Sequence, residues 1–180
     1  MRTRNSLLNR LDDLKQLSNG AALDLGAGAG NDSAWMIERG YTVTALDKDA
    51  SKLRTNEALK DKATIIEQSW DEFVFTPNTL NLIVAQNTFP FLSREKAERV
   101  ITDAVSALQS GGFICYTLFG PKDAWSHKET MHFVSYEDAI SFAEQLPVEI
   151  FFRSNEVGYG TTMSGDMKFW EVHRIILKKK

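Results

Sequence analysis

Residues that would mark an extracellular or membrane-embedded protein are scarce in this chain. A single cysteine among 180 residues excludes an internal disulfide, and Cys115 lies in an apolar segment where a cysteine usually packs as a small hydrophobic residue. No apolar run is long enough to span a bilayer, and the N-terminal residues lack the apolar core of a signal peptide. The composition therefore predicts a soluble, cytoplasmic protein without a membrane partner.

Charge of one sign is not concentrated in any long stretch either. The chain has 21 basic and 24 acidic residues, for a net charge of -3, and its basic cluster Lys178–Lys180 is short and terminal. A protein that binds nucleic-acid backbones has to neutralise several phosphates, so we expect no nucleic-acid partner. The histidines and the cysteine show no metal-ligand spacing with one another or with acidic residues, so we expect no metal site.

Hydrophobic residues, by contrast, are plentiful and regularly spaced. They make up 43% of the chain, which is enough for the full core of one domain over residues 1–180, and no linker or repeat divides the sequence. Near the N-terminus the leucines fall on one face of a predicted helix over 6–17. We therefore expect residues 1–19 to contribute a helix that packs on the rest of the domain.

Strands alternate with helices along most of the chain, which predicts an α/β fold with a doubly wound, parallel sheet. The expected strands cover residues 21–25, 41–46, 63–68, 80–86, 112–118, 147–153 and 169–177. The expected helices after the first cover residues 32–39, 50–59, 97–108 and 135–145. Glycine and serine residues without a helical pattern join the last two strands, so these strands can pair as an antiparallel hairpin. In open sheets of this kind a ligand binds at the carboxyl ends of the strands.

The most informative motif is the run Asp24-Leu-Gly-Ala-Gly-Ala-Gly30, which follows a buried strand and precedes a helix. Glycines allow a tight turn that a ligand can touch, and the free N–H groups of the next helix point back at that turn. Asn31 or Asp32 is suited to cap this helix. The third glycine comes one residue earlier than in the dinucleotide fingerprint, and an acid at Asp24 is unfavourable beside a diphosphate. The motif therefore predicts a nucleotide- or nucleoside-binding loop.

A second acidic residue supports this interpretation. Asp47 ends the next predicted strand and follows Gly30 at nearly the spacing, roughly 20 residues, at which an acid meets ribose hydroxyls in such folds. An ionised carboxylate can accept two hydrogen bonds from a cis-diol. Because NAD and S-adenosylmethionine both carry an adenosine ribose, Asp47 by itself does not separate the two cofactors.

These motifs together resemble the class I S-adenosylmethionine-dependent methyltransferases and, more narrowly, the small tellurite-resistance methyltransferase branch. The resemblance spans nearly the whole chain and rests on Asp24–Asn31, Arg39–Lys48, the turn Ser110-Gly111-Gly112 and the closing segment Val172–Lys180. It implies a mostly parallel, seven-stranded sheet whose last strand is antiparallel. It also implies methyl transfer from S-adenosylmethionine to a small-molecule or metalloid oxyanion acceptor. The chain has no inserted substrate domain, so there is room only for a compact acceptor pocket.

The resemblance further implies a cofactor site at the carboxyl ends of the first four strands. It places the methionine part of the cofactor against the glycine loop, the ribose hydroxyls at Asp47 and the adenine beside Lys48. The implied cofactor-binding residues are Asp24, Gly26, Ala27, Gly28, Asn31, Asp47, Lys48, Ser69, Trp70, Gln86 and Asn87.

One part of this implied site, the end of the third strand, departs from the family. Ser69 and Trp70 stand where family members usually carry an acid that binds the adenine amine. Here Ser69 can form a hydrogen bond and Trp70 can stack on the base, or Trp70 can instead cover the core. Gln86 and Asn87 follow the fourth main strand, beside the amino-acid part of the cofactor.

The sequence offers one weak candidate for acid–base catalysis, His127, because imidazole titrates near neutrality and this residue follows the fifth strand. A solvated loop histidine is the alternative for His127 and also for His132, whereas His173 is expected to be a sheet residue. Tyr159, between two glycines, is either a turn residue or a side chain that closes over the site. Three functions stay open: a methyltransferase, a non-catalytic S-adenosylmethionine-binding protein, and an NAD(P)-dependent oxidoreductase, which the glycine spacing disfavours.

Overall fold

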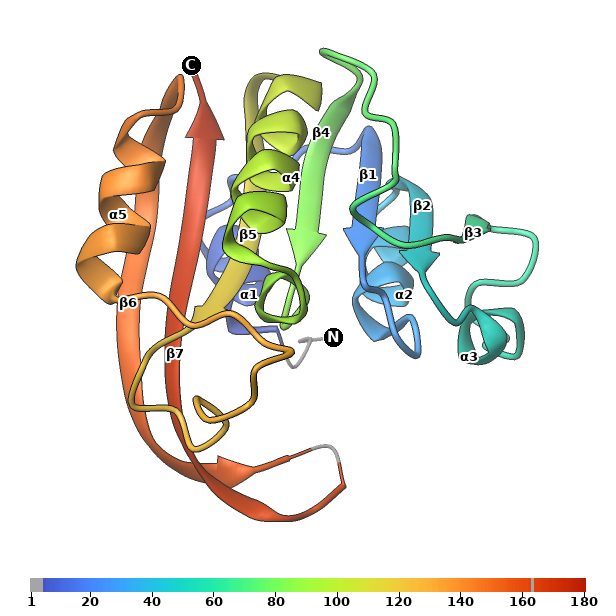
Figure 1. Ribbon diagram of the computed structural model, residues 1–180. Helices are drawn as coiled ribbons and strands as arrows, with labels where there is room; N and C mark the ends of the chain where they lie inside the picture. The colour runs from blue at the N-terminus through green and yellow to red at the C-terminus, as the bar shows by residue number, and fades with distance from the viewer. Residues whose placement is uncertain (1–4, 163) are drawn as a thin grey trace.

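Seven strands form one sheet in the order β3-β2-β1-β4-β5-β7-β6 in the computed structural model, which describes residues 5–162 and 164–180 (Figure 1). The strands are β1 (Ala21–Leu25), β2 (Thr42–Asp47), β3 (Ala63–Glu67), β4 (Leu80–Ala85), β5 (Leu108–Phe119), β6 (Val148–Thr161) and β7 (Met167–Lys179). The helices are α1 (Ser6–Asp13), α2 (Asn31–Glu38), α3 (Ser51–Arg54), α4 (Arg94–Ala107) and α5 (Tyr136–Glu144), and the short 3-10 helix η1 (Phe89–Phe91) follows β4.

The strand directions explain where a ligand site can form. Strand β1 pairs in parallel with β2 on one side and with β4 on the other, and β5 continues in parallel beside β4. The last strand, β7, lies between β5 and β6 and runs antiparallel to both. The expected α/β, doubly wound, seven-stranded sheet with an antiparallel last strand is therefore confirmed. The chain order reverses between β1 and β4, and ligands bind at such a switch point.

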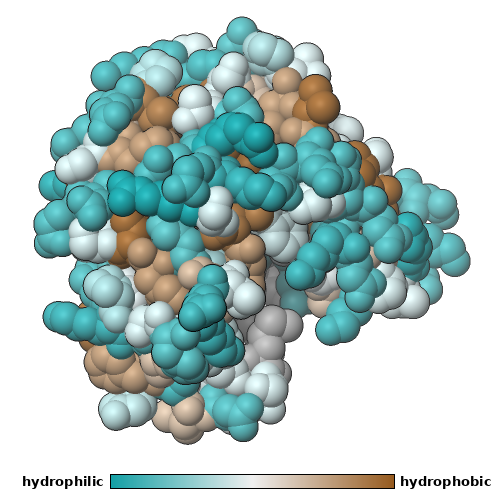
Figure 2. Space-filling model, viewed as in Figure 1, coloured by the Kyte–Doolittle hydropathy of each residue, from teal (hydrophilic) through white to brown (hydrophobic). Residues whose placement is uncertain are grey.

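Helices cover both faces of the sheet and bury its apolar side chains. On one face Val100 of α4 and Ile140 of α5 belong to the same apolar cluster as Leu23 of β1. On the other face α1 and α2 pack through Leu8 and Met36. Hydrophilic residues cover most of the surface seen in Figure 2, and that surface is hollowed between the β6–β7 hairpin and the side that carries α2 and α3.

The β6–β7 hairpin continues beyond the end of β5, whose last residue, Phe119, pairs with Val172. Residues 157–162 and 164–171 form this extension, which we call the hairpin arm, and it curves away from the rest of the sheet at the bottom of Figure 1. The strand expected over 147–153 is therefore much longer in the structure. Gly158 and Gly160 lie in this longer strand. The sequence around them predicts a turn, but both pair in register with β7, and Gly158 lies opposite Trp170.

Four other sequence predictions of local structure are wrong. Helix α2 is preceded by Gly30 in a left-handed conformation without a side-chain cap, so neither Asn31 nor Asp32 caps it. The helix expected over 50–59 shortens to α3, because the side chain of Asn56 donates to Ala29 O (2.7 Å) and accepts from the backbone of Ala58 (3.0 Å).

Helix α1 ends at Asp13, earlier than the leucine spacing predicts. Strand β5 begins at Leu108 instead of the expected Gly112, so the expected turn Ser110-Gly111-Gly112 lies within the strand. Helix α1 packs on the sheet through Leu7, Leu8 and Leu11.

Candidate functional site

The glycine loop connects β1 to α2 at the switch point of the sheet. Gly26, Gly28 and Gly30 all have positive φ, which glycine adopts without the strain that a side chain would add. The backbone N–H groups of Gly26 and Ala27 both donate to Leu46 O, at 2.8 and 3.1 Å, so the loop is fixed against the end of β2.

Each of the three glycines has a different surrounding. A Cβ atom on Gly26 would collide with the hydroxyl of Thr88, and a Cβ atom on Gly30 would lie 2.7 Å from Leu59 Cδ2. At Gly28 a Cβ atom would meet nothing within 4 Å. The first and third glycines are therefore needed for packing within the protein, whereas the middle glycine borders open space that a ligand can occupy.

Asp47 lies directly beside this open space. Its Oδ2 atom accepts a hydrogen bond from the backbone N–H of Gly28 (2.8 Å), and its Oδ1 atom accepts one from the N–H of Asp49 (3.1 Å). Each carboxylate oxygen has a second lone pair, so the group can still accept from a pair of hydroxyls. Asp47 is therefore joined to the loop at the glycine that borders open space.

Asp24 occupies a more enclosed position at the end of β1. Its side chain is 3% exposed, and Oδ2 accepts a 2.6 Å hydrogen bond from the hydroxyl of Ser33 on α2. Burial, together with the negative charges of Asp32 and Asp47, raises the pKa of Asp24 from 3.8 to about 7. A cationic ligand group nearby would favour the ionised form of this carboxyl.

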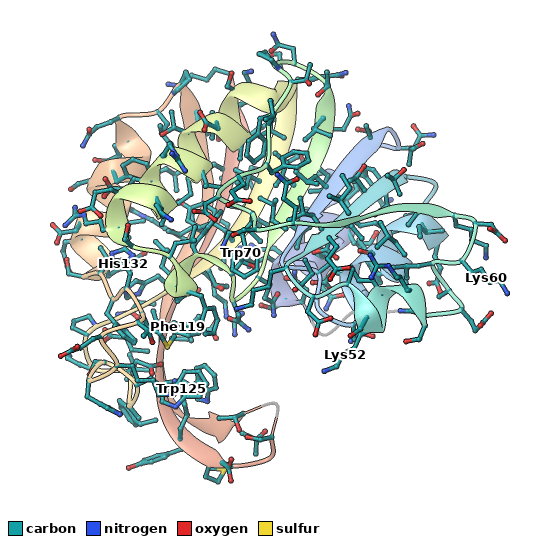
Figure 3. The ribbon with its side chains drawn as sticks, turned by 45° about the vertical axis from the view of Figure 1, so that its right-hand side comes forward. Lys52, Lys60, Trp70, Phe119, Trp125 and His132 are labelled. Atoms are coloured by element: carbon teal, nitrogen blue, oxygen red, sulfur yellow. The ribbon has the colours of Figure 1, made fainter. Side chains whose placement is uncertain are left out.

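The end of β3 carries the residues expected beside an adenine. Ser69 donates to Asp71, which also forms a 2.7 Å ion pair with Lys96. Trp70 is 6% exposed and belongs to the hydrophobic core, with Lys48 Nζ 5.8 Å from its ring centre (Figure 3). The carboxylate of Asp71, two residues after Ser69, is thus already engaged by Ser69 and Lys96.

The end of β4 is joined to both neighbouring strands. Thr88 donates to Leu25 O at 2.7 Å, and the N–H of Asn87 donates to the hydroxyl of Thr117 at 2.8 Å. Asn87 has a φ of 55°, in the left-handed region. Gln86 Oε1 is buried and has no hydrogen-bond partner within the described part of the chain. The sequence did not single out Thr88 or Thr117, because their hydrogen-bond partners lie far away along the chain and no local motif marks them.

A pocket of about 420 Å³ lies between this strand end and the β6–β7 hairpin, and we call it the hairpin pocket. Its lining residues are Gln86, Asn87, Glu156, Val157, Gly158, Tyr159, Thr161, Thr162, Trp170, Val172 and Arg174. Most of them come from β6 and β7, and among these only Tyr159 was a candidate from the sequence. Arg174 and Glu156 form a 2.8 Å ion pair within it.

The three histidines lie outside this pocket. His127 is exposed, and His132 is half-buried with its backbone N–H donating to Pro90 O. Burial lowers the pKa of His132. His173 is fully buried, with Nδ1 3.1 Å from Asn155 Oδ1 and Nε2 2.8 Å from Val134 O, as expected for a sheet residue. His127 is therefore not brought together with the other candidate site residues.

The residues at this rim fit the cofactor that the resemblance implies. Gly28 borders open space, Asp47 offers carboxylate lone pairs there, and Gln86 Oε1 is a buried acceptor in need of a donor. Asn31 is exposed at the start of α2, and Ala27 lies in the same loop. Over residues 5–162 and 164–180 no group of three or more metal-ligating side chains is placed to hold a metal ion. Within the same residues no helix is long and apolar enough to cross a bilayer.

Comparison with known proteins gives a consistent result. The model of a family described as "Methyltransferase domain" matches residues 22–112. An uncharacterized methyltransferase of Bacillus cytotoxicus is 27% identical over 146 residues, which cover 79% of this chain and 68% of that protein. An uncharacterized methyltransferase of Geobacillus thermodenitrificans is 28% identical over 57% of this chain and 49% of its own length. The chain thus spans between half and about two thirds of the length of these relatives.

Among solved structures, TehB from Haemophilus influenzae superposes with a TM-score of 0.79 at 19% identity, over 96% of this chain and 62% of TehB. An S-adenosylmethionine-dependent methyltransferase from Methanosarcina mazei gives a TM-score of 0.75 at 17% identity, over 99% of both chains. At these identities the structural similarity establishes the fold.

Proposed function

Because this chain belongs to the class I S-adenosylmethionine-dependent methyltransferases, we propose that it transfers the methyl group of this cofactor to a small acceptor bound in the hairpin pocket. Membership of this family decides against the NAD(P)-dependent alternative. A protein that binds the cofactor without turnover is the alternative that the experiment below tests.

One observation carries the proposal. The hairpin pocket begins at Gln86 and Asn87, which directly follow β4, and β4 is the immediate neighbour of β1 and its glycine loop. A ligand in the loop and a molecule in the pocket would therefore meet at the end of β4. The pocket volume of about 420 Å³ suits a small molecule.

The roles of the loop residues follow from their hydrogen bonds. Asp47 would hold the ribose hydroxyls while Gly28 provides room beside it. Asp24, buried behind the loop, would supply negative charge near the cationic part of the cofactor. Gln86 would accept a hydrogen bond from the amino-acid part. Lys48, Ser69 and Trp70 would lie beside the adenine. Asn31 would lie next to the cofactor where the glycine loop ends and α2 begins.

The chemistry asks little of the protein beyond alignment. S-adenosylmethionine supplies an activated methyl group on a sulfonium sulfur. The acceptor's lone pair forms the new bond to the methyl carbon as the carbon–sulfur bond breaks and leaves its electron pair on sulfur. An acceptor that is already ionised has lost its proton to water beforehand and needs no catalytic base, whereas a neutral hydroxyl or amine passes its proton to a base such as water as the new bond forms. Holding the two reactants in line can contribute about 7–11 kcal/mol to lowering the barrier.

A metalloid oxyanion is a second candidate acceptor, and Arg174 is the observation that favours it. This guanidinium lines the hairpin pocket, and arginine binds oxyanions through paired N–H donors. Glu156, its ion-pair partner, would oppose a second anion at the same place. The resemblance to the tellurite-resistance branch adds support for this acceptor, whereas the Arg174–Glu156 pair supports a neutral small molecule.

Two measurements test the proposal in sequence. Calorimetric titration with S-adenosylmethionine, S-adenosylhomocysteine and NAD⁺ is expected to give micromolar binding of the first two and none of NAD⁺. Formation of S-adenosylhomocysteine is then followed with phenols, thiols, amines, selenite and tellurite as acceptors. Binding without turnover on any acceptor would identify a non-catalytic protein, and failure to bind either sulfur compound would contradict the cofactor assignment.

A further inference from the structure

Gly158 is a glycine that neither the backbone nor the packing requires. It lies inside β6, where glycine weakens a strand because it contributes no side chain and loses more entropy on folding. Its φ is outside the left-handed region, and a Cβ atom placed on it would meet nothing within 4 Å. A glycine inside a strand often marks a bulge, a bend, or a place where a ligand or another backbone approaches closely, and the register around Gly158 shows no bulge.

The space over Gly158 belongs to the hairpin pocket. Gly158 pairs directly with Trp170 of β7, and side chains of such an antiparallel pair point to the same side of the sheet. Both residues line the pocket. A side chain at position 158 would therefore project into the pocket beside the indole.

Trp170 leans away from Gly158 and leaves its backbone uncovered. The indole Nε1 donates to Gly160 O at 3.1 Å, and a Cβ atom on Gly160 would lie 3.2 Å from Trp170 Cδ1. Lys168 Nζ lies 3.7 Å from the ring centres of Trp170 and Trp125 and forms a buried ion pair with Asp123. Figure 3 shows Trp125 beside the hairpin arm. These contacts fix the indole in place as a wall.

The other side of the same space carries charge. Glu156 and Arg174 form their ion pair on the pocket side, and Val172 lies between Trp170 and Arg174 along the same face of β7. The space over Gly158 thus has a bare peptide as its floor, an aromatic wall on one side, and one donor and one acceptor group on the other.

We infer that this space is a slot for a flat aromatic ring, so that Gly158 determines which acceptors the enzyme takes. The inference rests on the proposed function and names the acceptor class, a small aromatic compound whose polar edge faces Glu156 and Arg174. A flat ring can contact the peptide groups on either side of Gly158 directly, because glycine has no side chain. A larger residue at position 158 would prevent that contact. An edge contact between aromatic rings adds binding free energy beyond that of burial, which a saturated ring of the same size does not gain.

Phenol and cyclohexanol test the slot, because both are neutral and have the same number of ring atoms. Their binding to the protein saturated with S-adenosylhomocysteine is measured by ligand-observed NMR. Phenol is expected to bind at least about 3-fold more tightly than cyclohexanol. In Gly158→Val the affinity for phenol is expected to fall about 10-fold or more, because the valine fills the slot.

Glu149→Val is the matched control, since Glu149 is exposed in the same strand and lies outside the pocket. This variant is expected to bind phenol as the unchanged protein does. Both variants are expected to retain their thermal midpoint and their affinity for S-adenosylhomocysteine. Equal affinity for the two alcohols, or unchanged phenol binding in Gly158→Val, would overturn the inference.

The outcomes separate this inference from the proposed function. If S-adenosylhomocysteine does not bind, the proposed function fails, and the same two alcohols are titrated without it to test the slot. If the cofactor binds and turns over with non-aromatic acceptors while Gly158→Val remains as active as the unchanged protein, the slot fails and the function stands.

Discussion

The Oδ2 atom of Asp47 accepts a 2.8 Å hydrogen bond from the backbone N–H of Gly28 and so joins the end of β2 to the middle of the glycine loop. Gly28 is also the loop glycine that borders open space. The acid expected at the ribose and the backbone expected to touch the ligand are thus parts of one arrangement. We make five predictions from this arrangement and from the buried charges of the protein.

Asp47→Ala is expected to weaken binding of S-adenosylmethionine by about 10- to 100-fold, because a hydrogen bond to a charged group contributes roughly 1.5–3 kcal/mol. Isothermal titration calorimetry measures the change. Asp49→Ala is the control, since Asp49 accepts from Ser51 N at the start of α3 and is exposed. Unchanged affinity in Asp47→Ala would rule out this carboxylate as the ribose ligand.

Gly28→Ala is expected to lose cofactor affinity because its new Cβ atom enters the space beside Asp47. Gly111→Ala is a close control, since Gly111 also has positive φ and a Cβ atom there would also meet nothing within 4 Å. Both variants are expected to lose about 1 kcal/mol of stability from backbone strain. Only Gly28→Ala is expected to weaken S-adenosylmethionine binding, and equal binding by the two variants would place the ligand elsewhere.

Asp24 is expected to make the free energy of unfolding depend on pH. Its pKa is about 7 in the folded protein and 3.8 as the ordinary value, so the folded state holds the proton more tightly. The resulting stabilisation is fully present below about pH 4 and is lost as the pH rises through about 7. Asp24→Asn, which stays neutral, is expected to be more stable than the unchanged protein above pH 7, as measured by urea unfolding across this range.

The same carboxyl is expected to affect cofactor binding. Ionisation of Asp24 favours the positively charged sulfonium over the neutral thioether, so the preference for S-adenosylmethionine over S-adenosylhomocysteine is expected to grow as the pH rises through about 7. In Asp24→Asn this pH dependence is expected to disappear. If both proteins showed the same pH profile, Asp24 would not be the titrating group.

Lys168→Met is expected to destabilise the protein by about 3–5 kcal/mol, because it leaves the buried carboxylate of Asp123 without its partner. Adding Asp123→Asn to this variant is expected to recover part of the loss. Lys96→Met removes the cation of an ion pair in which Lys96 is 56% exposed, and is expected to change stability by at most about 1 kcal/mol. Similar losses for the two lysines in chemical denaturation would contradict a special role for the buried pair.

The sequence predicted well those features that depend on neighbouring residues. Strand β1 begins and ends at the predicted residues 21 and 25, because an apolar run followed by closely spaced glycines leaves little choice to the backbone. The alternation of elements was enough to predict the doubly wound sheet. Predictions failed where a side chain from elsewhere intervened, as at α3, where the hydrogen bond from Asn56 to Ala29 ends the helix early.

The site divides in the same way. The composition and spacing of the chain by themselves determined the glycine loop, the two acids at the ends of β1 and β2, and thereby the family, since each depends on a few consecutive residues. Only the tertiary structure decided that Thr88 packs on Gly26, that Lys168 pairs with Asp123, and that the hairpin continues into an arm beside the end of β4. These contacts join residues 45 or more positions apart, such as Lys168 and Asp123, and no local pattern encodes a partner at that distance.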